Sequence, residues 1–501
     1  MGLKSAIALL YAKKVSSKIK KESKNAIRSQ RNCFLELIST AAQTKFGQDH
    51  KFSEIRTYKD FVERVPVRDY EELSSYIELL KQGKPNILWP GKPAYLSKTS
   101  GTTSGVKYIP ITKDSIPNHI NTARNALMCY VAAKNSAAIV DGKMIFLSGS
   151  PELTQINGIP LGRLSGIVNH HVPGYLKGNQ LPSFETNCIE DWEAKLDAIV
   201  EETMNRDMTV ISGIPPWVQM YFDKLTKNSG KRIKELFPNF SLFVYGGVNY
   251  DPYRSKLENS IGAQVDSVEL YPASEGFIAY QDSLDNSNGM LLNTNSGIFY
   301  EFVKADDFFN EDRQRISLED VVVGENYAII LSTNAGLWAY NIGDTVKFIS
   351  VDPYRLVVSG RIKHFISAFG EHVIAQEVDK AISEACAACN VAVTEFTVAP
   401  EVTPNTGLPY HEWFVEFETE VEDLQNFEKV LNDSMIKQNI YYKDLITGNV
   451  LKDLVVNRIK KNGFIDYMKS KGKLGGQNKL PRLSNDRKIA DELSTFTIKK
   501  N

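Results

Sequence analysis

The spacing of hydrophobic residues changes along the chain. In roughly the first 90 residues, apolar side chains recur at helical spacing in residues 32–46 and 58–83, and Pro66 interrupts the second run. After this point, short β-rich runs alternate with Gly/Pro turns and helical stretches. Such runs cover residues 143–149, 208–225, 242–261 and 266–277. The pattern predicts a helical beginning followed by an α/β sheet.

Two of these strand-like runs lead directly into the start of a helix. Ile214 is followed by Pro215 and Pro216, and Asp251, a good N-cap, is followed by Pro252. Repeated strand–helix units predict a sheet with a substantial parallel part. Ligands bind at the carboxyl ends of such strands, so the loops that follow them are candidates for one shared site. These loops are residues 99–105, 148–151, 212–216, 245–248 and 271–276.

The pattern changes again towards the C-terminus. Residues 326–349 are predicted to form strands around a turn, and residues 354–382 a strand, a turn, a strand and a helix. This second run is typical of the beginning of a smaller α/β domain near Gly360. Because no low-complexity linker separates the two parts, we expect a large domain over residues 1–358 and a small one over residues 359–501, joined by a short hinge.

Composition narrows the class of protein. Hydrophobic residues make up 42% and charged residues 24% of 501, which excludes large-scale disorder. With 59 Lys+Arg against 60 Asp+Glu there is no net charge to favour nucleic acid. Five cysteines form no disulfide framework, so we expect a cytoplasmic protein. The basic segment 13–38 is interpreted as a solvated helical face, so no stable membrane association is expected.

The run YLSKTSGTTSGVKYIPIT, residues 95–112, concentrates small hydrogen-bonding residues and is the first candidate for chemistry. Small residues let backbone N–H groups approach a phosphate closely, and hydroxyls and a nearby cation add to its binding. The residues that would do so are Ser100, Gly101, Thr102, Thr103, Gly105 and Lys107. Val106 stands where a Walker A loop needs lysine, so this is not that motif. From these residues alone, a surface loop is the more common interpretation, because Ser/Thr/Gly clusters usually form one.

The same run resembles the first motif of the Gretchen Hagen acyl acid amido synthetases, an auxin-responsive plant family with bacterial relatives. The resemblance continues through AAQTKFG, FVERVPVRDYEEL and GKPNILWPG to the C-terminal part, and suggests a bacterial-type member. That family belongs to the adenylate-forming superfamily, with acyl-CoA synthetases, peptide-synthetase adenylation domains and luciferases. The resemblance therefore implies the superfamily's α/β fold: a large N-terminal domain of mixed sheets flanked by helices, and a small mobile C-terminal α/β domain.

Two further motifs carry the resemblance into the nucleotide site. YPASE, residues 271–275, matches Tyr-x-x-Ser-Glu with Tyr271 and Ser274, and implies that Glu275 holds Mg²⁺ on the ATP phosphates. Upstream, Gly246 and Gly247 resemble the segment that flanks the adenine. YNIGD, residues 340–344, matches Tyr-Arg-x-Gly-Asp, and implies that Asp344 accepts the ribose hydroxyls. Asn341 replaces the arginine of this motif, which puts the support that arginine gives in doubt.

The remaining matches lie at the hinge, near the C-terminus and on a helix. Arg361 resembles a residue near the ribose and Lys363 the pivot of the small domain. QNKLPR matches Gln-x-Lys-x-Pro-Arg and implies that Lys479 is the catalytic lysine that bridges the carboxylate and the α-phosphate. Arg124, predicted on the helix after the phosphate loop, is a candidate partner for the carboxylate or a polar tail of the acid.

Together these matches imply an ATP- and Mg²⁺-dependent ligase. It would convert a small carboxylic acid to an acyl-AMP and transfer the acyl group to an amino acid, forming an amide. Two alternatives remain open at this point. The acceptor can be a thiol such as coenzyme A, or the chain can be a catalytically silent nucleotide-binding protein. The joint presence of Glu275, Asp344 and Lys479 argues against the silent protein.

Overall fold

The structure, a computed structural model of the chain, describes residues 3–100, 106–172, 174–247, 250–362, 365–366, 373–402, 404, 406–447, 450–473, 480–484 and 487–498. Contacts between residues divide the chain into two compact units. The first contains residues 1–248 and 260–358, and the second contains residues 249–259 and 359–501. From the sequence we expected residues 1–358 to form one domain, so the assignment of residues 249–259 to the second unit was not predicted.

Helices form the beginning of the first unit, which confirms the prediction from apolar spacing. They are α1 (Leu3–Ser23), α2 (Ala26–Ala41), α3 (Lys45–Asp49), α4 (Tyr58–Arg64) and α5 (Tyr70–Lys81). α4 ends just before Pro66, because proline has no N–H to continue the helix. α5 begins with a capping box in which Asp69 accepts from the Glu72 amide at 3.2 Å and Glu72 accepts from the Asp69 amide at 2.8 Å.

A large mixed sheet follows, as the alternating runs predict. The strands found among the described residues lie in the order β13 (Ile316–Ser317), β12 (Ile298–Lys304), β14 (Asn326–Thr333), β15 (Tyr340–Val351), β16 (Tyr354–Arg361), β11 (Met290–Leu292), β10 (Gly276–Tyr280), β9 (Asp266–Ala273), β8 (Leu242–Gly246), β7 (Met208–Ser212), β3 (Lys143–Phe146) and β6 (Gln180–Leu181). β6, β3, β7, β8 and β9 pair in parallel, whereas β9 to β11 pair antiparallel. The predicted parallel part is therefore confirmed.

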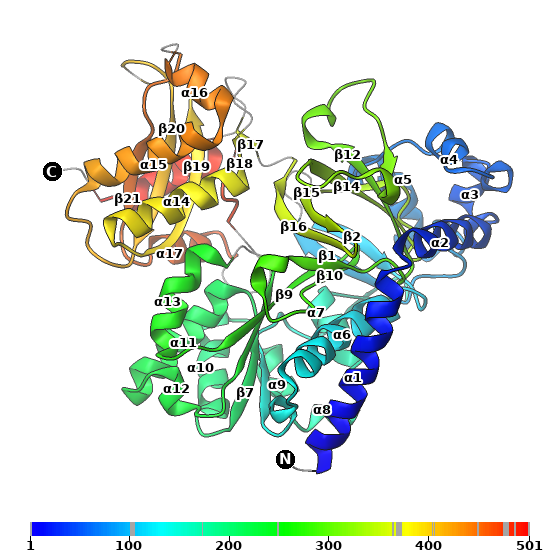
Figure 1. The fold of residues 1–501 in the computed structure, drawn as a ribbon, viewed down its shortest axis with the longest axis horizontal. Coiled ribbons are helices and arrows are strands. Elements are labelled where there is room, and N and C mark those ends of the chain that lie inside the picture. The colour runs from blue at the N-terminus through cyan, green and yellow to red at the C-terminus, as the bar shows by residue number, and fades with distance from the viewer. Residues whose placement is uncertain are drawn as a thin grey trace. The chain divides into compact units, whose positions relative to one another are not determined.

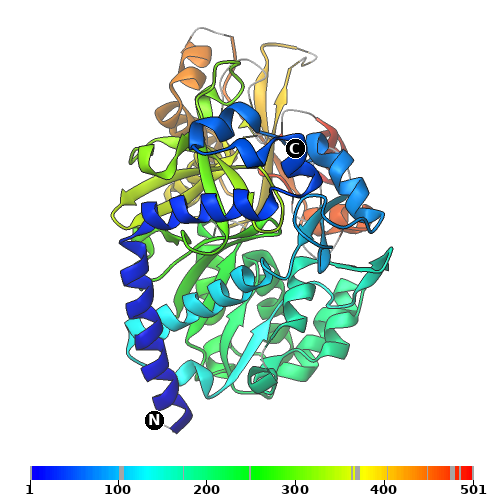
Figure 2. The same ribbon diagram turned by 90° about the vertical axis from the view of Figure 1, so that its right-hand side faces the viewer.

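Helices cover both sides of the parallel strands (Figure 1). β7 and β8 are buried along nearly their whole length, which explains why their sequences are continuously apolar rather than alternating. α6 (Ile116–Lys134) packs on β9 and β10, and α1 runs along α6, as Figures 1 and 2 show. α10 (Trp192–Thr203) and α11 (Pro215–Ser229) pack against each other. None of the described helices is both long and apolar enough to cross a membrane.

A smaller sheet in the first unit carries the hydroxyl-rich run. Its strands lie in the order β2 (Val106–Ile111), β1 (Tyr95–Ser100), β5 (Ile159–Gly162) and β4 (Thr154–Ile156). β1 and β2 pair antiparallel over six positions, from Tyr95 opposite Ile111 to Ser100 opposite Val106. The predicted phosphate loop therefore connects two paired strands.

The second unit is built around a three-stranded sheet. β19 (Val393–Glu401) pairs antiparallel with β20 (Tyr410–Phe417), and β20 pairs in parallel with β21 (Val455–Ile459). Two apolar clusters bury its two faces, one with α14 (Ala375–Cys389) and α15 (Leu424–Gln438), and the other with α17 (Gly463–Ser470) and α18 (Lys488–Leu493). The unit also contains α16 (Ile440–Thr447), the pair β17 (Phe365–Ile366) and β18 (Val373–Ile374), and most of α13 (Asp251–Ile261).

Candidate functional site

The hydroxyl-rich run contacts the second motif through its strand. On β1, the buried Ser97 hydroxyl donates a hydrogen bond to the Ser274 hydroxyl at 3.1 Å. Ser274 lies in the turn between β9 and β10, next to Glu275. Ser97 is three residues before Ser100, a distance of about 10 Å along a strand. The strand that leads into the predicted phosphate loop is therefore attached to the turn that carries the predicted metal ligand.

The second motif also contacts the third. The Tyr271 hydroxyl, on β9, donates a hydrogen bond to Asp344 Oδ2, on β15, at 2.7 Å. Tyr271 is buried, whereas the Asp344 side chain is half-buried. One strand end, residues 271–274, thus connects to both of the other motifs within the first unit. We had no way to derive these two contacts from the sequence.

The turn that presents Glu275 is held by a residue that the sequence did not single out. Asn118, buried on α6, accepts a hydrogen bond from the Phe277 amide at 2.7 Å. Its side-chain amide donates to the Phe277 carbonyl at 3.2 Å and to the Ser296 hydroxyl at 2.9 Å. A Cβ at Gly276 would lie 2.5 Å from Ile298 Cδ1, so a side chain at this position would require the end of Ile298 to move. A lone asparagine in a helical run gives no signal for this role.

The glycine pair predicted near the adenine ends β8, at the carboxyl edge of the parallel strands. A Cβ at Gly246 would lie 2.4 Å from the Leu270 carbonyl oxygen, so the close approach of β9 alone requires glycine. Gly247 has a φ of +76°, a conformation that residues with a Cβ rarely adopt. Both glycines therefore have a backbone reason, and their contact with adenine stays a prediction.

Asn341, the departure from the third motif, has a local structural role. It is buried, and its side-chain oxygen accepts a hydrogen bond from the Gly343 amide at 2.8 Å. Its own amide donates to the Arg68 carbonyl at 2.8 Å. A side chain that bonds the backbone two residues ahead supports an irregular backbone, and the pairing of β15 with β14 shifts register here, directly before Asp344 and Thr345. Asparagine at this position thus supports the backbone that carries Asp344.

The cationic candidates differ in their surroundings. The Lys107 ammonium lies 5.7 Å from the ring centroid of Tyr70. Arg124, on α6, donates to Asn125 Oδ1 at 3.1 Å, and its Nε is buried without a hydrogen-bond partner among the residues that the structure describes. Arg361 is exposed at the end of β16. No acidic side chain forms an ion pair with Arg124 within the described part of the chain.

Several predicted residues lie outside the described residues. These are Gly101, Thr102, Thr103, Gly105, Lys363 and Lys479. For Ser100 the structure describes the strand position but not the side chain. Their assigned roles stay predictions.

A buried lysine holds the loop of residues 148–151, one of the loops predicted at the carboxyl ends of the parallel strands. Lys195, on α10, donates to the Ser148 carbonyl at 3.0 Å and to the Asn187 carbonyl at 2.7 Å. Burial lowers the pKa of its ammonium group to about 8, a shift that the nearby Cys188 opposes. Lys195 thereby fixes the loop that follows β3. The sequence showed this loop but not the lysine that holds it.

Comparison with known proteins identifies the family. Three models match successive parts of the chain: the GH3 family N-terminal domain at residues 15–183, the GH3 family central domain at residues 291–361 and the GH3 family C-terminal domain at residues 376–488. The chain belongs to the GH3 (Gretchen Hagen) family. The resemblance inferred from the three motifs is thereby confirmed.

Named members of the GH3 family are distant from this chain in sequence. Jasmonoyl–L-amino acid synthetase JAR4 of Nicotiana attenuata is 21% identical over 65% of this chain and 67% of its own length. Indole-3-acetic acid-amido synthetase GH3.15 of Arabidopsis thaliana is 21% identical over 70% of each chain.

Solved structures confirm the fold class. The structure of the GH3.15 acyl acid amido synthetase matches with a TM-score of 0.81 at 16% identity, covering 97% of both chains. 2-Hydroxyisobutyryl-CoA ligase in the postadenylation state matches with a TM-score of 0.57 at 12% identity, covering 94% of this chain and 91% of that one. The GH3 chain described here therefore has the α/β fold of adenylate-forming enzymes, as the motifs implied.

Proposed function

We propose that this GH3 protein is an acid–amino acid ligase that cleaves ATP to AMP and pyrophosphate. It activates a small carboxylic acid with ATP and transfers the acyl group to an amino acid. The observation that carries the proposal is the junction of the three motifs, made by the contacts Ser97–Ser274 and Tyr271–Asp344. Family membership supports the same reaction, because GH3 relatives are named as amido synthetases.

In the first step a carboxylate oxygen attacks the α-phosphorus of ATP and pyrophosphate leaves. Two anions meet in this step, so positive charge placed in advance lowers its barrier. We assign that charge to Lys479, with backbone N–H groups of residues 100–105 and Lys107 holding the phosphates. Asp344 accepts hydrogen bonds from the ribose, and the Tyr271 hydroxyl fixes the direction of its carboxylate.

The turn that carries Glu275 fits a magnesium ligand. Its carboxylate is half-buried beside Ser274, and hard oxygen donors suit Mg²⁺. The described residues contain no group of three or more acidic, histidine or cysteine side chains that could hold a metal. Magnesium in nucleotide enzymes needs no such cage, because one carboxylate and the substrate phosphates hold it. When bound, the ion would neutralise charge on the phosphates.

In the second step the amine of an amino acid attacks the acyl carbonyl and AMP leaves with the former carboxylate oxygen. AMP is a far better leaving group than oxide, which is why activation comes first. Arg124 is our candidate for the carboxylate or a polar tail of the acid. Its buried Nε has no partner among the described residues, so an anionic ligand would satisfy it.

Acid-dependent ATP–pyrophosphate exchange tests this function. We expect exchange for at least one acid in a panel of aromatic, indolic and fatty acids. K479A should reduce the exchange rate by about 10²–10³-fold and leave ATP binding nearly unchanged, because one preorganised charge is lost from the transition state. ATP binding without exchange for any acid would instead indicate a silent nucleotide-binding protein.

A thiol acceptor is the second candidate, because the fold also matches a CoA ligase. AMP release measured with amino acids and, separately, with coenzyme A distinguishes the two. We expect release to be accelerated by an amino acid. Faster release with coenzyme A alone would make this chain an acyl-CoA synthetase.

We further propose a cytoplasmic location, no nucleic-acid partner and no stable membrane association. The five cysteines, which form no disulfide framework, support the location. The balanced charge supports the absence of a nucleic-acid partner, although α1 and α2 carry many lysines and arginines. Sedimentation with anionic liposomes, compared between the full chain and a variant lacking roughly the first 30 residues, tests it. Equal recovery of both in the supernatant is expected.

A further inference from the structure

The short segment of residues 480–484 is attached to the open edge of the sheet in the second unit. β19 is the end strand of that sheet. The Val398 amide donates to the Arg482 carbonyl at 2.9 Å, and the Ser484 amide donates to the Val398 carbonyl at 2.9 Å. Leu483 lies opposite Val398 in a parallel bridge. These bonds fix the register of the segment on β19.

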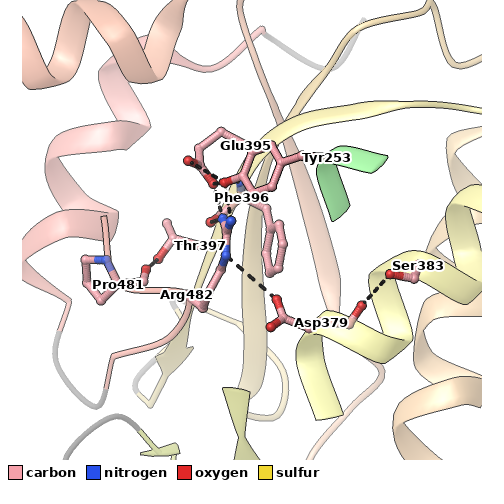
Figure 3. Close-up of polar contacts among 8 residues, drawn as sticks. All are labelled: Tyr253, Asp379, Ser383, Glu395, Phe396, Thr397, Pro481 and Arg482. Atoms are coloured by element: carbon pink, nitrogen blue, oxygen red, sulfur yellow. Dashed lines mark hydrogen bonds and ion pairs between the residues drawn. The ribbon is translucent and has the colours of Figure 1, made fainter. Parts of the chain in front are cut away.

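A side chain adds a fourth attachment directly before Arg482. The Thr397 hydroxyl donates to the Pro481 carbonyl at 2.7 Å, as Figure 3 shows. Thr397 is itself buried. Pro481 has a fixed φ, and a residue before proline is restricted to extended conformations, so Leu480 has little freedom either.

The two leucines of the segment bury opposite faces. Leu483 is fully buried in the cluster that includes Trp413, and Leu480 packs on the cluster that includes Phe414 and Tyr467. Because side chains alternate across a strand, a slip by one residue would exchange these faces. The apolar contacts therefore specify the same register as the hydrogen bonds.

Arg482 secures the segment through charge (Figure 3). Its guanidinium donates to Glu395 and to the Tyr253 hydroxyl, and to the Phe396 carbonyl at 3.2 Å. Its Nε lies 3.7 Å from Asp379 Oδ1. The guanidinium carbon lies 4.5 Å from the ring centroid of Phe396 and 5.2 Å from that of Tyr253. Both the position and the plane of this fork are thus determined.

The surroundings of Arg482 and Tyr253 favour the protonated form of both groups. Burial by itself would lower the pKa of Arg482, but Glu395, Tyr253 and Asp379 outweigh it and raise the pKa above its usual value. Burial is the main reason that the pKa of the Tyr253 hydroxyl is also raised. Tyr253 therefore stays neutral and donates to Glu395 at 3.1 Å. Arg482 therefore stays positively charged and Tyr253 stays neutral over the pH range in which an enzyme works.

We propose that Arg482 is a positioning residue for Lys479, an inference that rests on the proposed function. Lys479 lies outside the described residues, but it is three residues from Arg482 in the chain. Three extended residues span at most about 10–11 Å. The two residues in between, Leu480 and Pro481, have restricted backbone conformations. The contacts of Arg482 therefore fix the part of the chain that directly follows Lys479 in the sequence.

The kinetic test combines R482Q with K479A. We expect R482Q to lower kcat for ATP–pyrophosphate exchange by about 10²-fold with little change in KM for ATP, because a small misplacement of a reacting group has an effect of this size. Transfer from a synthetic acyl-adenylate to an amino acid should be retained. In the K479A background, R482Q should change exchange less than about threefold, since residues that act as a unit are not additive. An equal loss in both backgrounds overturns the proposal.

Matched variants separate positioning from general stability. Arg487 also binds carboxylates in the same unit, those of Glu401, Glu412 and Asp491, but it follows Lys479 by eight residues. R487Q should keep exchange within about threefold of wild type. If R482Q folds poorly, T397V removes only the bond to the Pro481 carbonyl and should lower the same step by a smaller factor. Loss of both half-reactions together would mark Arg482 as merely structural.

Hydrogen exchange tests the anchor without any activity. In R482Q we expect amide exchange to accelerate more at Val398 and Ser484, whose N–H groups bond the segment and β19, than at the amides of β20 and β21. R487Q should leave the first two amides protected. Unchanged protection in R482Q refutes the anchor even if the enzyme is active. Absence of acid-dependent exchange in the wild type refutes the proposed function instead, and leaves this second result to decide on the anchor.

Discussion

The two regions that we connect with adenylation are held by different kinds of interaction. In the first unit the motifs meet through hydroxyl and amide hydrogen bonds, Ser97 to Ser274, Tyr271 to Asp344, and Asn118 to Phe277. In the second unit the segment after Lys479 is fixed by a buried guanidinium between carboxylates. Such hydrogen bonds each contribute about 1–3 kcal/mol and can exchange partners when a ligand arrives, whereas a buried ion without its partner is strongly destabilising.

The largest effect should come from removing a carboxylate from the buried network. E395A leaves Arg482 with less compensating charge, and we expect the second unit to lose about 3–5 kcal/mol of stability. Urea unfolding, monitored by hydrogen exchange of β20 amides, measures this. E401A is the control, because Glu401 faces Arg487, which is only partly buried, and should cost about 1 kcal/mol or less. Equal losses would mean that the two networks do not differ.

The first unit also contains a buried cation, Lys195. It is bonded to backbone carbonyls, whereas Arg482 in the second unit is paired with carboxylates. The pKa of Lys195 is lowered to about 8 from 10.5, so between these values the folded state binds fewer protons than the unfolded state. The contribution of this group to stability therefore rises with pH across that window, by at most about 3 kcal/mol. Unfolding by urea at pH 7.5 and pH 10 should show this rise for wild type and a flatter profile for K195M. Parallel profiles would contradict the assignment.

The hydrogen bonds of Asn118 should matter less than the charges but more than a single hydroxyl. N118A leaves the Phe277 amide and carbonyl without this partner, which should cost about 1–3 kcal/mol and lower the melting temperature. N121A, exposed on the same helix, is the control. If Asn118 also positions the turn of Glu275, exchange should fall in N118A below the level that its melting temperature explains. Identical behaviour of the two variants would remove Asn118 from the site.

The smallest effect is expected from one hydroxyl. Y271F removes the hydrogen bond to Asp344, and the freed carboxylate should bind ribose less well, raising KM for ATP by about five- to tenfold. The matched control is Y130F, which removes a similar bond from Tyr130 to Asp266 at 2.9 Å, at the start of β9 and five residues before Tyr271. An equal rise in KM for ATP in Y130F, or no rise in Y271F, would contradict the role of Asp344 in nucleotide binding.

Local rules predicted much of the fold. Apolar spacing identified the N-terminal helices, Pro66 marked a helix end, and continuous apolar runs identified the parallel strands β7 and β8. These features depend on neighbours in the chain. The assignment of residues 249–259 to the second unit depends on distant contacts, such as that of Tyr253 with Arg482, and the sequence gives no signal for it.

The residues of the candidate site likewise include some that the sequence identified and some that it did not. Its motif residues were named from a resemblance, because their chemistry is concentrated in short runs. Ser97, Asn118 and Lys195 were missed, since each is an ordinary polar residue that gains its role from a partner more than 40 positions away or from a loop carbonyl. Asn341 shows the converse, because a residue that looks like a defect in a motif supports the irregular part of β15 before Asp344.

The most direct test of the account follows an oxygen atom. An acid that supports exchange is labelled with ¹⁸O in its carboxylate and incubated with ATP, Mg²⁺ and an amino acid, and the AMP is analysed by mass spectrometry. Attack of the carboxylate on the α-phosphorus predicts one ¹⁸O in each AMP formed, with an amide as the second product. Unlabelled AMP, or ¹⁸O in inorganic phosphate, would contradict adenylation of the acid by this chain.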